Sequence, residues 1–402
     1  MAVPTFCESM VFFYLDLFCN PFFTFFIPFN RVNFFWRIQD YTPTLSRNSI
    51  LYLTNFEYSM KAAVIKSDSQ IEIENFDAPE LSPNDILVKM QVCGICGSDV
   101  EKVFGKYGQP SMKLGHEPAG IIIQVGSNVQ DFKEGDRVFT HHHVACYSPD
   151  CHQCSHGNET MCDKYYQSNL NPCGLSEQYI VPGWNVTHGG VLKIPDSMTF
   201  DEAAMIEPLA CCVRAWSKFN YKKNDSAAIL GVGPTGMMHV LLAKLAQFSK
   251  IFCLDLNDYR LDFAKKFDVM AIRSDDNKLS EIILNSTEQR GVDIAIVATG
   301  NLKAFTQAID LVRKGGTIVM FGVPNKGDRI EIDMSVVYSK EISVITTYAA
   351  SDTDTKNALE LISSGKINVK SLITHKYTLN DSQKAFEHAK SGDHAMKIII
   401  EN

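Results

Sequence analysis

The sequence has few of the features that would mark a nucleic-acid-binding, repeat or disulfide-built protein. Its 38 Lys and Arg residues are outnumbered by 46 Asp and Glu, so the formal net charge is −8 and no basic stripe is present. No internal repeat recurs, and the twelve cysteines are clustered rather than spread as in a secreted disulfide scaffold. An ordinary globular composition remains, 45% apolar and 21% charged, in a chain of 402 residues that suffices for two domains.

Residues 1–59 differ in composition from the rest of the chain. They contain twelve of the 25 phenylalanines and no lysine. The apolar stretch 11–29 carries two prolines and so makes a poor membrane-spanning helix, and no positive charge precedes Arg31 as a signal peptide requires. Three interpretations stay open: a non-native upstream extension with the true start at Met60, a membrane-associating or targeting tail, and an ordered extra element. We assign no chemistry to this segment.

A glycine-rich motif in the middle of the chain predicts a dinucleotide site. The apolar run Ala227–Leu230 has the character of a buried parallel strand and leads into Gly231, Gly233, Pro234 and Gly236, which fit the pattern G-x-G-x-x-G. The residues that follow have helical composition. Glycines in this pattern permit a tight turn and close approach to a pyrophosphate, and the helix N-terminus supplies amide donors.

The second strand of this region predicts the choice of cofactor. The run 251–254 ends at Asp255, nineteen residues after Gly236. A carboxylate at this place accepts hydrogen bonds from ribose hydroxyls and repels a 2′-phosphate, which favours NAD over NADP. Arg260 is close enough in sequence to accommodate a phosphate, and Asp255 as a helix-capping or loop acid is the alternative interpretation.

The alternation of strand and helix continues downstream. An apolar strand is predicted at 292–298, a helix at about 304–312, and a further strand at 317–321 after Gly315-Gly316. This pattern indicates a doubly wound parallel sheet with the cofactor across the carboxyl ends of its strands. Three residues that directly follow these strands are therefore expected beside the cofactor: Thr299, Gly300 and Gly322.

Upstream, an antiparallel β region is interrupted by two motifs with metal-binding side chains. One is the segment 93–99, Cys-Gly-Ile-Cys-Gly-Ser-Asp; the other is 115–120, Gly-His-Glu-Pro-Ala-Gly. The mixed set that could hold a catalytic zinc comprises Cys96, His116, Glu117 and Glu207. From spacing alone, the Cys-x-x-Cys segment could instead be a redox pair, and His116 could be an ordinary core histidine.

Four further cysteines lie within seventeen residues and match a closed tetrahedral zinc site: Cys146, Cys151, Cys154 and Cys162. The histidines nearby, at 141–143, 152 and 156, are alternative ligands, and a disulfide arrangement is the less favoured alternative. Such a group of thiols in an α/β chain indicates a reducing compartment, so we expect a cytoplasmic protein.

Together, these motifs resemble the zinc-containing medium-chain dehydrogenases, close in type to the sorbitol and threonine dehydrogenases, over the stretch from Met60 to Asn402. The matching segments are 93–99 with Cys96 as ligand, 115–117, 135–138, 207–209 and 231–236. In polyol-type members a glutamate stands in or beside the zinc shell at the position of Glu207. For Glu117, support of the ligands from outside the metal shell remains the alternative role.

The resemblance implies an α/β fold with a GroES-like, β-rich catalytic domain and a Rossmann-type, doubly wound nucleotide-binding domain. The boundaries expected are 1–59 for the atypical extension, 60–206 for the first part of the catalytic domain with a structural zinc lobe at 143–165, 207–345 for the NAD-binding domain and 346–402 for the rest of the catalytic domain. It also implies a homodimer or homotetramer. The expected partner is a small alcohol or carbonyl substrate, with no nucleic acid, and no membrane except through residues 1–59.

Three features depart from the family pattern. Four residues separate Cys146 from Cys151 where two are usual, which makes Cys146 the least certain structural ligand. Glu101 stands where many alcohol dehydrogenases have a relay histidine, so the proton is expected to leave through Ser98 and water. Cys173 precedes Gly174 where two glycines are common.

The predicted reaction is zinc-dependent hydride transfer between a secondary alcohol and NAD. The catalytic residues expected for it are Cys96, Ser98, His116, Glu117 and Glu207. The resemblance favours a polyol, a sugar alcohol or a 3-hydroxy amino acid, and it does not separate these from a butanediol or a sugar phosphate. Two other classes stay open: a zinc-independent quinone or enone reductase of the same fold, and a non-enzymatic NAD-binding protein.

Overall fold

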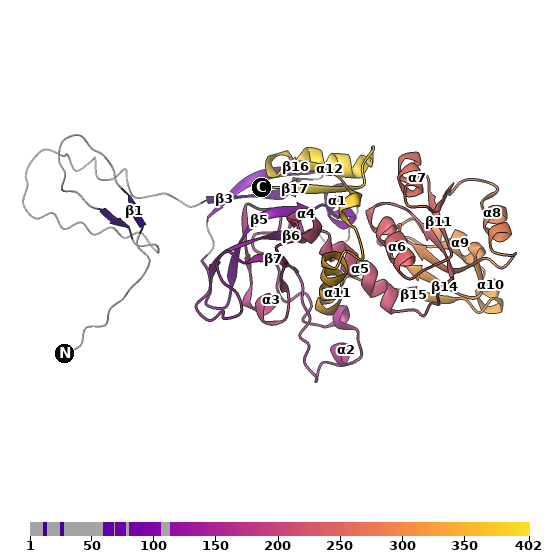
Figure 1. Cartoon of the computed structure of the whole chain (residues 1–402), viewed down its shortest axis with the longest axis horizontal. Helices are drawn as coiled ribbons and strands as arrows, with labels where there is room; N and C mark the ends of the chain where they lie inside the picture. The colour runs from indigo at the N-terminus through magenta and orange to yellow at the C-terminus, as the bar shows by residue number, and fades with distance from the viewer. Residues whose placement is uncertain (1–10, 14–24, 28–58, 68, 78–79, 106–112) are drawn as a thin grey trace, which may run out of the picture. The chain divides into compact units, whose positions relative to one another are not determined.

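The computed structural model describes residues 11–13, 25–27, 59–67, 69–77, 80–105 and 113–402. The chain divides into two units, Met1–Tyr58 and Ser59–Asn402. In the first unit, β1 (Val11–Phe13) pairs antiparallel with β2 (Phe25–Ile27), and its other residues lie outside the described ranges (Figure 1). Ser59, the last residue of the predicted extension, belongs to the second unit. Among the described residues, no helix is both long and apolar enough to cross a membrane.

The second unit contains a mixed sheet of seven strands in the order β16-β17-β5-β6-β7-β9, with β8 paired to β5. These strands are β5 (Ile86–Gly94), β6 (Glu117–Val125), β7 (Arg137–Thr140), β8 (Gln178–Val181), β9 (Val191–Lys193), β16 (Ile373–Thr378) and β17 (Lys397–Glu401). The hairpin β3 (Ser59–Ser67) and β4 (Gln70–Asp77) forms a separate two-stranded sheet. Because β17 pairs antiparallel with β5, the last strand of the chain lies beside a strand from its first third.

A second sheet of six parallel strands has the order β12-β11-β10-β13-β14-β15. Its strands are β10 (Ser226–Leu230), β11 (Lys250–Asp255), β12 (Met270–Arg273), β13 (Val292–Val297), β14 (Val312–Met320) and β15 (Ser343–Thr346). The helices between them are α6 (Pro234–Leu245), α7 (Asp258–Lys265), α8 (Leu279–Ser286), α9 (Leu302–Leu311) and α10 (Met334–Ser339) (Figure 1). Strand order reverses between β10 and β13, where doubly wound sheets bind ligands. The predicted doubly wound fold is confirmed.

Several element boundaries differ from those predicted. Helix α6 begins at Pro234, inside the glycine motif, because proline suits the first position of a helix. Strand β14 begins at Val312 and runs through Gly315 and Gly316, which were expected to precede it. The register against β13 shifts near Val292, so the glycines are absorbed at an irregularity of the sheet instead of forming a separate loop.

Two helices join the sheets. Helix α5 (Ile206–Ser217) packs against α11 (Asp352–Ser363), and apolar residues of both belong to the core cluster that includes Ile229 of β10. The shorter helices are α1 (Gly97–Phe104), α2 (His152–Ser155), α3 (Gly183–Thr187) and α4 (Phe200–Ala203). Helix α12 (Ser382–Ser391) ends at Gly392, whose φ of 61° is the left-handed conformation that closes helices. This continuous core fixes the first turn of α5, which carries Glu207.

Candidate active site and metal centres

Three of the predicted metal ligands meet between β5 and β6. Cys96 lies at the N-cap of α1, while His116 and Glu117 lie at the start of β6. Their donor atoms all lie within 4.8 Å of one another. Gly94 faces Glu117 across the β5–β6 pair, and a Cβ at that glycine would collide with the carboxylate. The local sequence therefore leaves room for a carboxylate beside a thiol and an imidazole.

Asp99 orients the imidazole of His116. The Oδ2 atom of Asp99 lies 3.0 Å from Nδ1 of His116, and its Oδ1 atom accepts a hydrogen bond of 2.7 Å from Lys102 Nζ. Burial by itself would raise the pKa of Asp99, but His116 and Lys102 hold it well below its usual value. With Nδ1 engaged, Nε2 of His116 is the nitrogen left for a metal. Asp99 was not among the predicted site residues, although it lies only three residues after Cys96.

Glu117 forms a buried ion pair with Lys397 of β17. The two side chains are 0% and 3% exposed, and Lys397 Nζ also donates a hydrogen bond of 3.0 Å to the carbonyl of Ile95. Burial raises the pKa of Glu117, although Lys397 opposes the effect. The second oxygen, Oε1, is buried and has no hydrogen-bond partner among the described residues. Lys397 was not among the predicted site residues, although a lysine at the start of an apolar strand could have indicated a buried partner of opposite charge.

The donor set suits a zinc ion. A thiol, an imidazole nitrogen and a carboxylate oxygen without another partner are ligands that zinc accepts. Burial by itself would lower the pKa of His116, yet Asp99 and Cys96 raise it well above its usual value. The surroundings thus favour a positive charge at this point. The residues present fit a metal ion.

Glu207 lies outside this group of three but lines the same cavity as Cys96 and His116. Its Oε1 atom accepts a hydrogen bond of 3.4 Å from the thiol of Cys211, one turn further along α5. Ser98 also lines the cavity, and its hydroxyl donates to Cys96 Sγ at 3.3 Å. Cys211 was not among the predicted site residues. It lies four residues after Glu207, a spacing that places both on one face of a helix.

Two cavities meet at the candidate metal-binding residues. The larger has a volume of about 680 Å³ and the other about 530 Å³, and both are lined by Cys96, Pro208 and Thr235. The smaller cavity runs along the carboxyl ends of β10, β11 and β13. The predicted cofactor residues that line it are Gly231, Gly233, Pro234, Asp255, Arg260 and Thr299.

The remaining predicted cofactor residues have packing roles. A Cβ at Gly236 would strike the carbonyl of Gly231, so this glycine allows helix α6 to lie close to the loop. A Cβ at Gly300 would strike the carbonyl of Val323, and one at Gly322 would strike the backbone of Thr299. Gly236, Gly300 and Gly322 do not belong to the lining of the smaller cavity.

Asp255 fixes the glycine-rich loop. Its Oδ2 atom accepts a hydrogen bond of 2.9 Å from the amide of Val232, and its Oδ1 atom accepts two more from Leu256 and Asn257 at 2.8 and 3.0 Å. Arg260 NH1 lies 3.9 Å from Oδ2. The side chain of Asn257 caps α7, so Asp255 is not the capping residue.

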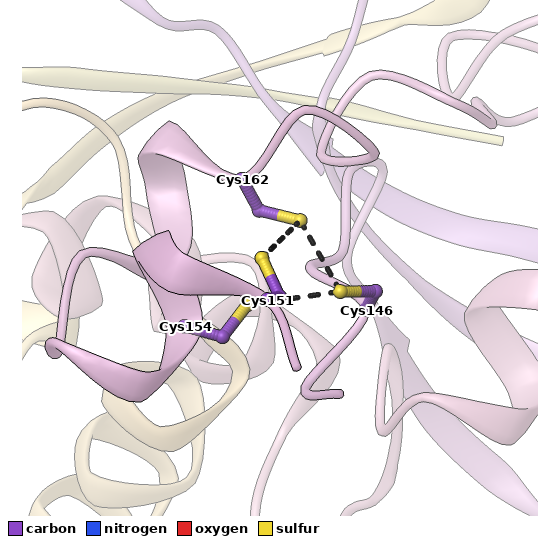
Figure 2. Close-up of side chains that lie close together, drawn as sticks. All are labelled: Cys146, Cys151, Cys154 and Cys162. Carbon is purple, nitrogen blue, oxygen red and sulfur yellow. Dashed lines mark hydrogen bonds between the residues drawn. The ribbon is translucent and has the colours of Figure 1, made fainter. Parts of the chain in front are cut away.

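The four lobe cysteines converge as the zinc hypothesis requires (Figure 2). Their Sγ atoms lie within 4.8 Å of one another, with pairs at 3.5, 3.8 and 3.9 Å, and all four are free thiols. Within the longer spacing after Cys146, Tyr147 has a left-handed φ of 48°. His152 and His156 are exposed, and their rings contact each other in a tilted arrangement outside the group. The cluster fits a closed, four-thiolate site.

The other two departures from the family pattern have different surroundings. Glu101 is exposed on α1 and does not line the larger cavity. Cys173 is buried and does line it, with its thiol 3.5 Å from the carbonyl of Leu175.

Comparisons with known proteins match both halves of the second unit. Residues 82–196 match the family described as alcohol dehydrogenase GroES-like domain, and residues 234–364 match zinc-binding dehydrogenase. The chain is 34% identical over 352 residues to sorbitol dehydrogenase of Bacillus subtilis, covering 85% of this chain and 97% of the relative. It is 32% identical over 351 residues to D-xylulose reductase A of Aspergillus oryzae, covering 84% and 95%. A crystal structure of 2R,3R-butanediol dehydrogenase from Bacillus subtilis aligns with a TM-score of 0.75 at 26% identity, covering 86% and 100%.

Proposed function

The chain belongs to the zinc-containing medium-chain dehydrogenase family, and on that premise we propose that it oxidises a polyol or related secondary alcohol with NAD at the site around Cys96. The observation that carries the proposal is that Cys96 lines both cavities. A substrate in the larger cavity and a nicotinamide in the smaller one would meet beside the same thiol. Relatives named as sorbitol dehydrogenase and D-xylulose reductase support a polyol substrate.

Cys96, His116 and a carboxylate from Glu117 or Glu207 would hold the catalytic zinc. When bound, zinc supplies Lewis acidity that lowers the pKa of a substrate hydroxyl. The Ser98 hydroxyl donates a hydrogen bond to Cys96 Sγ, which leaves its oxygen lone pairs free to accept a hydrogen bond from the substrate hydroxyl. Asp99 keeps His116 oriented, and Thr235 and Pro208 bound the passage between the cavities.

Zinc content and turnover test the proposal together. We would measure zinc per full-length chain by mass spectrometry, and NAD reduction with sorbitol, xylitol, 2,3-butanediol, threonine and a hexitol phosphate. Two zinc ions per chain and activity on one of these substrates are expected. A chain without zinc that reduces quinones or enones would overturn the proposal in favour of the zinc-independent reductase. NAD binding without turnover of any alcohol would favour a binding protein.

Cys96→Ser is the matching variant. We expect it to lose one zinc ion and all alcohol oxidation while it still binds NAD, because the smaller cavity is otherwise unchanged. Cys253→Ser, at a buried cysteine of β11 outside both metal clusters, is the control and should keep both zinc ions. Full zinc content and full activity in Cys96→Ser would contradict the assignment.

We further propose NAD rather than NADP as the cofactor. Asp255 and Asp275 both line the smaller cavity, and their charges oppose a 2′-phosphate. Asp255→Ala should weaken NAD binding and relax the discrimination against NADP, whereas Asp262→Ala, at an exposed position of α7, should change neither. An unchanged cofactor preference in Asp255→Ala would show that this residue does not set the preference.

We also propose a cytoplasmic homo-oligomer. Strand β15 is the edge of the parallel sheet, and exposed apolar residues accompany it: Tyr338 is 85% exposed, Met334 62% and Val344 45%. Unpaired sheet edges with apolar neighbours invite association with another chain. Light scattering after size exclusion should give a dimer or tetramer, and Val344→Lys should shift the equilibrium toward the monomer.

The free thiols of the four-cysteine lobe support a reducing compartment, which cell fractionation would test.

A further inference from the structure

The larger cavity carries hydrogen-bonding groups that the reaction at Cys96 does not use. His142 and His143 lie just after β7, and Thr347 follows β15 from the other half of the unit. All three line the cavity together with Ser98 and Glu207. From the sequence, these histidines were predicted only as alternative ligands for the four-cysteine lobe.

Two of these residues have a buried polar atom without a partner. Nδ1 of His142 and Oγ1 of Thr347 are inaccessible to solvent and make no hydrogen bond within the described part of the chain. Buried polar groups are nearly always satisfied, and each exception calls for an explanation such as a ligand. Both exceptions lie in the wall of one cavity, the one that begins at the metal-binding residues.

His143 presents an acceptor to the same cavity. Its Nδ1 atom lies 2.9 Å from the carbonyl oxygen of Ser168, which can only accept, so Nδ1 carries the proton. Burial lowers the pKa of His143 to about 4, and the ring is therefore neutral near pH 7. Nε2 is consequently left as a bare acceptor, suited to the O–H of a ligand.

The backbone beneath these histidines is held rigidly. The buried side-chain amide of Asn185 donates to the carbonyl of His141 at 2.7 Å and to that of His142 at 3.1 Å. The rings of His142 and His143 lie 4.1 Å apart, and that of His142 lies 5.1 Å from the ring of His116. A row of imidazoles thus leads from the metal-binding residues outward along the cavity wall.

We propose that His142, His143 and Thr347 form a hydroxyl-binding subsite that holds the polyol chain beyond the reacting carbon. The inference rests on the proposed function and deepens it, because it names what selects a polyol over a simple alcohol. A ligand hydroxyl can donate a hydrogen bond to His143 Nε2 or accept one from the Thr347 hydroxyl, whereas a methyl group would leave both groups unpaired. Polyols are therefore favoured over secondary alcohols of similar length that lack further hydroxyls.

The test compares kcat/KM for xylitol and for 2-butanol. His142→Phe and His143→Phe keep a planar ring but remove the hydrogen-bonding nitrogens. Each is expected to lower kcat/KM for xylitol by about tenfold or more, the factor for one lost hydrogen bond, and to leave kcat/KM for 2-butanol within about twofold. His143→Gln, which restores an acceptor, should recover part of the loss. His188→Phe, at a histidine stacked on Trp184 outside the cavity, is the matched control and should change neither substrate.

Two kinetic outcomes would overturn the subsite. An equal loss for both substrates would indicate a structural role, and no loss for xylitol would exclude a contact with the polyol chain. A wild-type protein that oxidises no alcohol would instead defeat the proposed function. In that case, calorimetry of xylitol binding to the zinc- and NADH-loaded protein decides separately: absence of binding, or binding unaffected by His142→Phe and His143→Phe, would overturn the subsite itself.

Discussion

Glu117 and Lys397 are two buried charges that depend on each other. Moving either from water into the core is costly, and the cost is offset only while the partner is present. Glu117 remains next to the Cys96 thiol because Lys397, from a strand that pairs with β5, supplies the compensating charge. The pair therefore sets both the stability of this region and the charge of the metal site.

Replacing one partner should be far more harmful than replacing both. Lys397→Met leaves the carboxylate uncompensated, so we expect a loss of about 3–5 kcal/mol in the free energy of unfolding. It also removes the group that opposes the rise in the pKa of Glu117. The double variant Glu117→Gln/Lys397→Met should recover most of the loss. Urea unfolding of the metal-free proteins measures this coupling, and strictly additive effects would contradict it.

Some residues of the candidate site could be predicted from the sequence and others could not. Cys96, His116 and Glu117 lie in short motifs whose side-chain chemistry alone suggests a metal. Asp99 and Lys397 act on those ligands through contacts, and an isolated aspartate or lysine carries no such signal. Spacing therefore predicted the candidate ligands but not the residues that orient them and balance their charge.

At the level of the elements, Asp293 of β13 accepts hydrogen bonds from both neighbouring strands of the parallel sheet. Its Oδ2 atom accepts hydrogen bonds from the amide and hydroxyl of Ser226 at the start of β10, at 2.8 and 2.7 Å. Its Oδ1 atom accepts one of 2.6 Å from Arg313 Nε of β14. Burial would raise the pKa of Asp293, but Arg313 and Ser226 lower it below the usual value. One carboxylate thus joins three neighbouring strands.

The stabilisation by Asp293 should depend on pH. Because its folded-state pKa is depressed, the contribution is complete above the unfolded value of about 3.9 and is lost as the pH falls through the folded value. Asp293→Asn should lower the free energy of unfolding at neutral pH by about 1–2 kcal/mol, and Tm with it. The difference in Tm between the variant and the wild type should shrink in acid. Thermal unfolding at both pH values checks this, with Asp262→Asn as the exposed control. An undiminished difference in acid would show that charge plays no part.

The elements themselves were largely predictable because strands and helices follow local patterns. The apolar runs that became β10, β11 and β13 were identified from the sequence, since strands buried on both faces are apolar along their length. Boundaries were less certain: the continuation of β14 through Gly315 depends on pairing with β13, which no local pattern specifies.

Across the whole molecule, the four-cysteine lobe is anchored to helix α11 and to helix α5, which lines the candidate active site. Arg214 of α5 lies 3.0 Å from Glu159 of the lobe and 3.2 Å from Asp354 of α11. Its NH2 group also donates to the carbonyl of Gly157 at 3.4 Å. The same helix α5 carries Glu207 in its first turn. The lobe is thereby part of the framework that positions the larger cavity.

Loss of the lobe metal should destabilise the protein before it abolishes catalysis. Cys154→Ser is expected to retain one zinc ion in place of two and to lower Tm, because a structural site contributes folding free energy. Turnover well below the new Tm should fall much less than in Cys96→Ser. Zinc analysis, thermal unfolding and alcohol oxidation provide the three readouts, and two zinc ions in Cys154→Ser would show that the lobe does not bind through this thiol.

The sequence by itself determined the fold class, the reaction class and the candidate ligands of both metal centres. Those features follow from short motifs and local hydrophobic patterns. The family models and the relatives agree with the predicted fold class and reaction class. Only the tertiary structure paired Glu117 with Lys397, 280 residues apart, and placed Thr347 in the same cavity wall as His142. The reason is physical: such contacts are set by which strands pair and how the two halves pack, and no pattern of neighbouring residues encodes them.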